Sequence, residues 1–127
     1  MSRTVLDASA LLALVNGEPG GQTVAENLHE SVISAVNLSE VVARMTDLGT
    51  SIDRVREHLE SLHLEVIPFD TADAYLAADL RQPTQQYGVS LGDRACLALA
   101  RRLRVPALTA DRRWAELDVG VDVQVIR

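Results

Sequence analysis

The sequence predicts a single α/β domain in which a mainly parallel β-sheet lies between two layers of helices. Short apolar runs of strand length alternate along the chain with longer segments in which apolar residues recur at helical spacing. This alternation is typical of βαβ units, which build a parallel sheet with helices on both faces. The 127 residues suffice for one ordinary domain and are too few for two. We therefore expect residues 1–127 to form one three-layer α/β/α sandwich.

The N-terminal half is predicted to begin with a strand and to continue mainly as helices. Val5-Leu6 form a short apolar run that ends at Asp7, and the segment Ala8–Val15, rich in alanine and leucine, follows as a helix. Residues 16–21 contain glycines and a proline, which end that helix. The remaining elements of this half are a helix over residues 23–30, a strand at Val32-Ile33, and helices over residues 37–48 and 52–62, both with apolar residues at helical spacing.

The C-terminal half continues the alternation of strands and helices. Residues 65–69 are predicted to form a strand, and the alanine-rich residues 70–81 a helix. The polar segment 82–88 is predicted to be a loop, and Ser90 opens a strong helix that ends near Arg104. The last predicted elements are a strand at Ala107–Thr109, a helical turn over residues 111–117 and an alternating edge strand over residues 121–126.

Composition and charge limit the possible functions. The net charge is −6 and all 12 basic residues are arginines. The lack of lysine excludes phosphoaspartyl receivers and haloacid-dehalogenase-type phosphatases, since both place a lysine at the phosphoryl group. The single cysteine, Cys96, lies in an apolar run and is expected to be buried, and the scattered histidines argue against a zinc site. Without a signal peptide or an apolar stretch of about 18 residues, we expect a cytoplasmic protein with no membrane partner.

Four acidic residues stand apart because each borders apolar sequence; they are Asp7, Glu40, Asp93 and Asp111. Each also has a purely structural explanation. Asp7 and Asp111 are suited to be the N-caps of the helices that follow them. Asp93 fits a capping box with Ser90, and Glu40 fits a looser one with Asn37. Taken one at a time, capping alone accounts for these acids.

Taken together, the four positions predict a cation site. In a doubly wound sheet the carboxyl ends of the strands and the N-termini of the following helices share one edge, where such folds bind ligands. We therefore expect all four carboxylates to converge on one crevice. Carboxylates within about 5 Å of one another would repel by about 3 kcal/mol per pair at an effective dielectric near 20. Hard divalent cations such as Mg²⁺ and Mn²⁺ prefer oxygen ligands and would relieve this repulsion.

Four motifs carry these acids, in the order Asp, Glu, Asp, Asp. They are Val5-Leu6-Asp7-Ala8-Ser9, Asn37-Leu38-Ser39-Glu40, Ser90-Leu91-Gly92-Asp93-Arg94 and Leu108-Thr109-Ala110-Asp111. Over nearly the whole chain this pattern resembles the PIN-domain ribonucleases, in particular the VapC-like toxins of type II toxin–antitoxin pairs. The first motif alone is unspecific, since many α/β proteins open with a strand that ends in aspartate. The last two acids, 18 residues apart, are the specific part of the likeness.

The resemblance implies a metal-dependent endoribonuclease that hydrolyses RNA phosphodiester bonds with one or two Mg²⁺ or Mn²⁺ ions. It implies Asp7 and Asp93 as the principal metal ligands and catalytic acids. Glu40 and Asp111 would complete the catalytic pocket, directly or through water. The accessory hydroxyls of the ligand shell are Ser9 and Thr109.

The partners implied by the resemblance are RNA, a cognate VapB-like antitoxin and a second toxin subunit, as a homodimer or a toxin–antitoxin hetero-oligomer. Candidates to hold RNA phosphates are the arginines nearest the acids, Arg94, Arg112 and Arg113, although solvated ion pairs explain them equally well. Trp114 either packs in the core or stacks on a base. The alternative to an enzyme is a PIN-like module that binds RNA or protein without cutting. The identity of the RNA and the role of residues 82–88 stay open.

Overall fold

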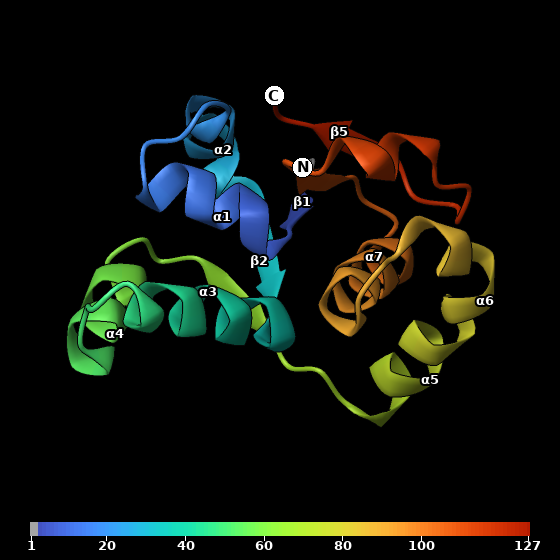
Figure 1. Ribbon diagram of the computed structural model, residues 1–127, viewed down its shortest axis with the longest axis horizontal. Coiled ribbons are helices and arrows are strands. Elements are labelled where there is room, and N and C mark those ends of the chain that lie inside the picture. Colours follow the sequence, from blue (N-terminus) through green and yellow to red (C-terminus); the bar gives the residue numbers. More distant parts are fainter. Residues whose placement is uncertain (1–2) are drawn as a thin grey trace.

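The structure is a computed structural model that describes residues 3–127, and its centre is a five-stranded parallel sheet (Figure 1). The strands are β1 (Thr4–Leu6), β2 (Ser31–Ser34), β3 (Glu65–Ile67), β4 (Ala107–Thr109) and β5 (Val123–Val125). They lie in the order β3-β2-β1-β4-β5, and every pairing is parallel. The chain adds β2 and β3 on one side of β1 and then β4 and β5 on the other. The topological switch point therefore lies between β1 and β4.

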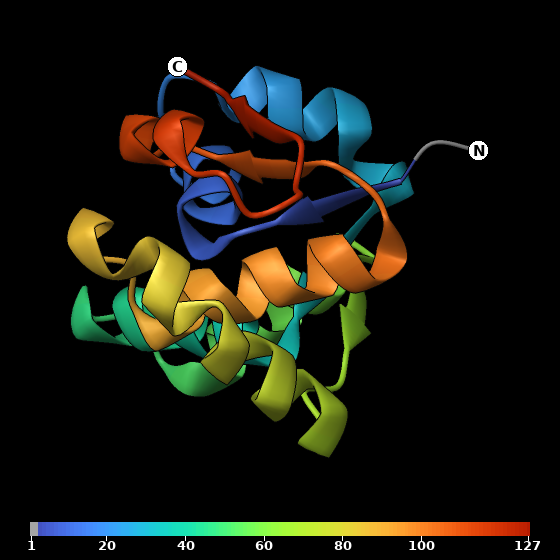
Figure 2. The same ribbon diagram turned by 90° about the vertical axis from the view of Figure 1, so that its right-hand side faces the viewer.

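Helices cover both faces of this sheet. One face carries α1 (Ala8–Val15), α2 (Gly21–Asn27), α3 (Ala35–Asp47) and α4 (Ile52–Glu60). The other face carries α5 (Thr71–Asp79), α6 (Arg81–Thr84) and α7 (Leu91–Leu103). Three short 3₁₀ turns complete the chain, η1 (Leu28–Glu30), η2 (Gln85–Tyr87) and η3 (Arg112–Glu116). Figure 2 shows α7 lying along the sheet with α5 on its outer side.

Alternation along the strands gives each helix layer its own core. Val5, Val32 and Ala107 are fully buried in a cluster with α7, whereas Leu6, Ile33 and Leu108 are buried in a second cluster with α1 and α3. Because successive side chains of a strand point to opposite faces, neighbouring residues of each central strand reach opposite helix layers. The predicted three-layer sandwich with a parallel sheet is confirmed.

Two local predictions are wrong. The segment 82–88 is not a loop, because α6 and η2 occupy most of it. Pro83 lies in the first turn of α6, where a missing backbone N–H is tolerated. Thr84 is buried, and its hydroxyl donates to the Leu80 carbonyl at 2.7 Å. The third helix begins at Ala35 with Ser34 as its N-cap, so Asn37 and Glu40 form no capping box there. The predicted burial of Cys96 is confirmed. Within residues 3–127 no helix is long and apolar enough to cross a membrane.

Candidate metal centre

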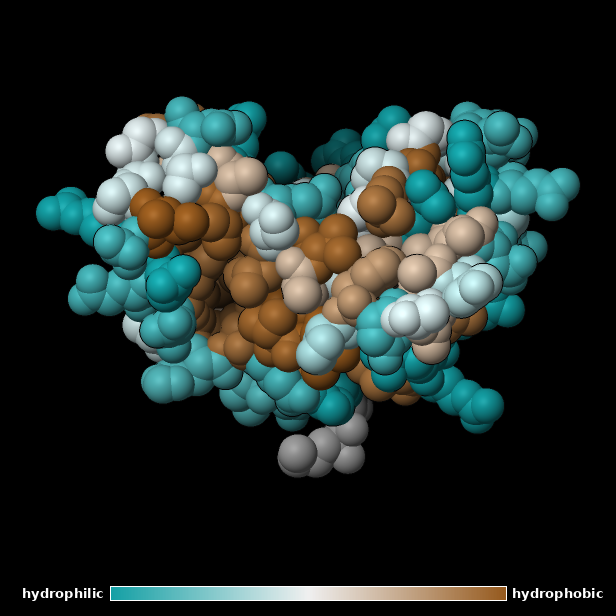
Figure 3. Space-filling view, turned by 90° about the horizontal axis from the view of Figure 1, so that it is seen from below, coloured by the Kyte–Doolittle hydropathy of each residue, from teal (hydrophilic) through white to brown (hydrophobic). Residues whose placement is uncertain are grey.

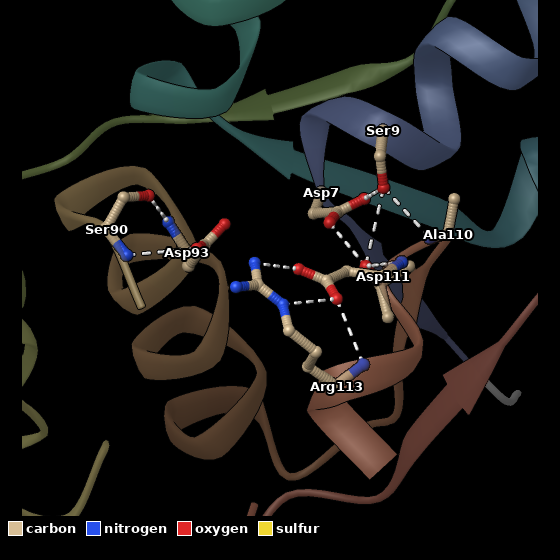
Figure 4. A network of polar contacts seen from close by, with 8 residues as sticks. Asp7, Ser9, Ser90, Asp93, Ala110, Asp111 and Arg113 are labelled. Atoms are coloured by element: carbon tan, nitrogen blue, oxygen red, sulfur yellow. Dashed lines mark hydrogen bonds and ion pairs between the residues drawn. The ribbon is translucent and has the colours of Figure 1, made fainter. Parts of the chain in front are cut away.

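The four acids lie on elements that meet at the carboxyl edge of the sheet. Asp7 follows β1 directly, and Asp111 follows β4 after one intervening residue, so these two flank the switch point. Glu40 lies in the second turn of α3, which leaves β2, and Asp93 lies in the first turn of α7. The fold therefore brings four acids that are distant in sequence to one end of the molecule, as Figure 4 shows for Asp7, Asp93 and Asp111.

Asp7 is the most buried of these carboxylates, with 4% of its surface exposed. Its Oδ1 accepts hydrogen bonds from the Ser9 hydroxyl at 2.7 Å and from the Ala10 amide at 2.8 Å, which makes Asp7 the N-cap of α1. Its Oδ2 accepts from the Thr109 hydroxyl at 2.6 Å. Burial outweighs these donors and raises the pKa of Asp7 from 3.8 to about 6, and the nearby charge of Asp93 adds to the rise.

Ser9 and Thr109 tie the two strand ends together. The Ser9 hydroxyl donates to Asp7 and accepts from the Ala110 amide at 2.9 Å. The Thr109 hydroxyl donates to Asp7 and accepts from the Asp111 amide at 3.0 Å. Each hydroxyl thus joins the turn after β1 to the turn after β4. This network fixes both carboxylate oxygens of Asp7 beside the backbone that carries Asp111.

Asp111 is paired with an arginine of its own turn. The guanidinium of Arg113 donates from Nε to Oδ1 at 3.1 Å and from Nη2 to Oδ2 at 2.7 Å, a bidentate contact. Asp111 Oδ1 also accepts from the Arg113 amide and caps η3. The pair lowers the pKa of the Asp111 carboxyl and raises the pKa of the guanidinium. In Figure 4 the guanidinium lies between Asp111 and Asp93, whose negative charge further stabilises it.

Asp93 is engaged by the N-terminus of its own helix. Its Oδ2 accepts from the Ser90 amide at 3.0 Å, while its amide donates to the Ser90 hydroxyl at 3.1 Å. This is the predicted capping box, and it is confirmed. The capping box uses only one carboxylate oxygen of Asp93. The other oxygen has no hydrogen bond among residues 3–127 and can still accept a ligand.

Glu40 packs against the same helix end. Its Oε1 accepts from the side-chain amide of Asn37 at 2.8 Å. That amide also donates to the Gly92 carbonyl at 2.9 Å, which bridges α3 to α7. The Glu40 carboxylate lies so close to the Gly92 Cα that a Cβ built there would meet Glu40 Oε2 at 2.3 Å. Glu40 is therefore held one residue from Asp93.

The negative charges of three of the acids affect the pKa of Cys96, a buried residue of α7. Burial raises the pKa of its thiol well above 9.0, and the charges of Asp7, Asp93 and Glu40 add to the rise. Yet no three acidic, histidine or cysteine side chains of the described chain stand close enough to hold one ion as they are. In this arrangement the acids of residues 3–127 therefore do not form a complete set of metal ligands. Each carboxylate accepts at least one hydrogen bond from a local donor, and the Arg113 guanidinium offsets the charge between Asp93 and Asp111.

The donor set nevertheless fits a hard divalent cation. It consists of carboxylate oxygens backed by the hydroxyls of Ser9 and Thr109, which are the oxygen ligands that Mg²⁺ and Mn²⁺ prefer. The Arg113 guanidinium already places a positive charge between Asp93 and Asp111 (Figure 4). Release of the Arg113 guanidinium would free Asp111 Oδ2 and leave Oδ1 with only the Arg113 backbone amide as a donor within residues 3–127.

Comparison with known proteins identifies the family. Residues 4–120 match the family model of the PIN domain. The chain belongs to the PIN-domain family. No curated protein matches its sequence.

Several solved structures with the same fold are toxin–antitoxin complexes. A toxin–antitoxin complex from Klebsiella pneumoniae matches with a TM-score of 0.74 and 22% identity over 98% of each chain. A DNA-bound VapBC from Salmonella typhimurium matches with a TM-score of 0.75 and 20% identity over the full length of both chains. VapBC-5 from Mycobacterium tuberculosis matches with a TM-score of 0.65 and 28% identity over 100% of this chain and 99% of its own.

The three candidate arginines of this PIN domain have different surroundings. Arg94 is half-buried and donates to the Ala77 carbonyl of α5. Arg112 is exposed and donates to the Arg127 carbonyl. Arg113 is the one that faces the acids, and 63% of its side chain is exposed. Trp114 is 1% exposed within the core of the α7 layer, so it packs and is not available to stack on a base.

Sequence reasoning missed two residues of the PIN-domain site. Asn37 was interpreted only as a helix cap, but it is 1% exposed and its amide joins Glu40 to α7. Gly92 was interpreted only as part of a capping box, but its lack of a side chain makes room for Glu40. Their positions relative to the acids could have indicated them. Asn37 precedes Glu40 by three residues on a helix, a spacing at which side chains meet, and Gly92 directly precedes Asp93.

Proposed function

We propose that this PIN domain is a metal-dependent endoribonuclease and the toxin of a toxin–antitoxin pair. The observation that carries the proposal is Asp7, a buried carboxylate at the switch point of the sheet whose pKa is raised to about 6. A protein gains no stability from such a group at neutral pH, and perturbed buried carboxylates gather at functional sites. Asp93, Asp111 and Glu40 at the same edge supply the further oxygens that a cation needs.

In this proposal Asp7 and Asp93 are the principal ligands of one or two Mg²⁺ or Mn²⁺ ions, and Glu40 and Asp111 complete the site. When bound, such an ion supplies Lewis acidity for the attack of water on an RNA phosphodiester. Ser9 and Thr109 orient the two oxygens of Asp7 by donating to them. Burial of Asp7 excludes water from one side of the site and strengthens its attraction for positive charge.

Arg113 gives this acidic protein a means to hold an RNA phosphate. In the structure its guanidinium is bound to Asp111. If Asp111 held a cation, the exposed Arg113 guanidinium would be free to make a bidentate contact with a phosphate in place of the one with Asp111. Arg112 is exposed on the same turn.

The toxin part of the proposal is supported by the fold shared with VapBC complexes. A VapB-like antitoxin would act on this chain in the cytoplasm, where the toxin would form a homodimer or a toxin–antitoxin hetero-oligomer. In the helix after Asp7, Leu11 is buried in the core, and Leu12 and Leu14 are half-buried against it. A better candidate surface is the hollow between α3 and α4, where Leu38, Val42 and Leu59 gather with Ile52, which is 55% exposed. Figure 3 shows apolar side chains on this face.

Cleavage of RNA by purified, antitoxin-free protein tests the enzyme. We expect cleavage of total RNA with Mn²⁺ or Mg²⁺, none with EDTA, and a loss of at least about 100-fold in Asp93→Asn, which removes a ligand charge. Asp118→Asn, which alters an exposed carboxylate outside the site, is the matched control and should cleave normally. RNA binding without cleavage would instead support the non-catalytic binding module, and cleavage that persists in EDTA would refute the metal-dependent mechanism.

A further inference from the structure

Glu40 occupies a place on α7 that only glycine leaves open. An added Cβ at Gly92 would lie 2.3 Å and 2.5 Å from the two carboxylate oxygens of Glu40 and 2.5 Å from its carboxyl carbon. Gly92 is buried in the first turn of α7, and its φ is not in the left-handed region. The backbone therefore does not require glycine at this position. What requires it is the side chain of Glu40.

Asn37 holds that carboxylate from the other side. One nitrogen, Nδ2, donates both to Glu40 Oε1 at 2.8 Å and to the Gly92 carbonyl at 2.9 Å. The same residue is 1% exposed, and its Oδ1 finds no hydrogen-bond partner among residues 3–127. A buried amide that leaves its own carbonyl unsatisfied is stabilised in that orientation by its donor contacts. Those contacts join Glu40 on α3 to the residue before Asp93 on α7.

We propose that Asn37 and Gly92 are positioning residues that hold Glu40 beside Asp93, so that acids from two separate helices act as one ligand set. The proposal rests on the proposed function, because it assigns these residues a purpose in metal binding. It also makes a claim that needs no metal. Filling the space at Gly92 must displace the Glu40 carboxylate and break its hydrogen bond with the Asn37 amide.

The first test is a double-mutant cycle of Gly92→Ala and Glu40→Ala, read as Mn²⁺ affinity by titration calorimetry. We expect Gly92→Ala to weaken Mn²⁺ binding by about 10- to 100-fold, as for other residues that orient metal ligands. Its unfolding temperature should stay the same or rise, because the displaced group is a flexible side chain and alanine favours a helix. In the Glu40→Ala background the same substitution should cause no further loss of affinity.

Two results of this cycle would overturn the proposal. One is wild-type Mn²⁺ affinity in Gly92→Ala. The other is an equal loss of affinity from Gly92→Ala in both backgrounds, which would mean that the methyl group acts on α7 itself and not through Glu40.

The second test uses metal-free protein and the NMR resonances of the Asn37 side-chain amide, assigned by their absence in Asn37→Ala. Gly92→Ala and Glu40→Ala should each shift these amide protons upfield and speed their exchange with water, since both variants remove the bond to Glu40. Unchanged resonances in Gly92→Ala would refute the positioning role. This readout separates the two hypotheses: if wild-type protein binds no Mn²⁺, the proposed function fails, while the amide resonances still decide how Glu40 is held.

Discussion

Replacing Asp7 with asparagine should stabilise the metal-free protein at neutral pH. The rise of the Asp7 pKa from 3.8 to about 6 means that its ionised form is disfavoured in the folded state by about 3 kcal/mol at pH values well above 6. Asparagine carries no charge and keeps the shape of the side chain. Its carbonyl oxygen can still accept from Ser9 and from the Ala10 amide. Its amide replaces the oxygen that faces Thr109, which costs about 1 kcal/mol for one lost hydrogen bond.

The sign of the pH dependence follows from the direction of the shift. Below 3.8 both the folded and the unfolded wild-type chain hold the proton, and the burial of Asp7 carries no ionic penalty. Between 3.8 and about 6 the unfolded chain releases the proton while the folded chain keeps it, so wild-type stability falls as the pH rises through this window. At about pH 4 the penalty is only about 0.5 kcal/mol, and above about pH 7 it reaches its full value.

The assay is urea denaturation of both proteins in EDTA at about pH 4 and about pH 7.5. We expect Asp7→Asn to be slightly less stable than wild type at the lower pH and about 2 kcal/mol more stable at the higher pH. The difference between the two proteins isolates Asp7 from other groups that titrate in the same range. Asp118→Asn, on an exposed turn, should show no such reversal. An Asp7→Asn variant less stable than wild type at both pH values would refute the reasoning and leave Asp7 as a helix cap only.

Two further predictions concern the turn after Asp111. Arg113→Gln should tighten Mn²⁺ binding by about two- to fivefold, because a cation no longer has to displace the exposed guanidinium from Asp111. The control in the same calorimetric titration is Arg112→Gln, which loses only a contact with the Arg127 carbonyl. Weaker Mn²⁺ binding by Arg113→Gln would contradict this prediction. Trp114→Ala should lower the free energy of unfolding by about 3–5 kcal/mol because the indole is buried, while RNA cleavage per folded molecule stays unchanged. A stable Trp114→Ala variant with impaired cleavage would instead point to base stacking.

The helices and strands were predictable because their signals are local. The apolar runs before Asp7 and Asp111 became β1 and β4, and both acids became the N-caps that their positions indicated. The capping box of Ser90 with Asp93 also needs only four neighbouring residues. Segment 82–88 was the exception. Its polar composition indicated a loop, but burial of Thr84 against α5 and packing of Tyr87 on the core stabilise short helical turns there.

The arrangement of the site was predictable only in outline. The rule that strand ends and helix starts share one edge placed Asp7, Glu40, Asp93 and Asp111 together. It could not supply the spacing between them, which depends on how α3 and α7 pack and on the pairing of Arg113 with Asp111. The predicted repulsion between the acids is present, since the charge of Asp93 raises the pKa of Asp7. Its relief by backbone amides, hydroxyls and a guanidinium was not predicted, because those donors come from contacts that a sequence does not display.

The order of the elements, the parallel sheet and the identity of the acids were determined by the sequence itself, because apolar periodicity and helix caps depend on residues a few positions apart. Only the tertiary structure decided that Thr109 binds Asp7 across 102 residues and that Asn37 reaches Gly92 across 55. Contacts of this kind depend on the distance between packed elements, where an ångström determines whether a hydrogen bond or a clash results. The role of Gly92 in making room for Glu40 therefore becomes visible only when α3 and α7 are packed together.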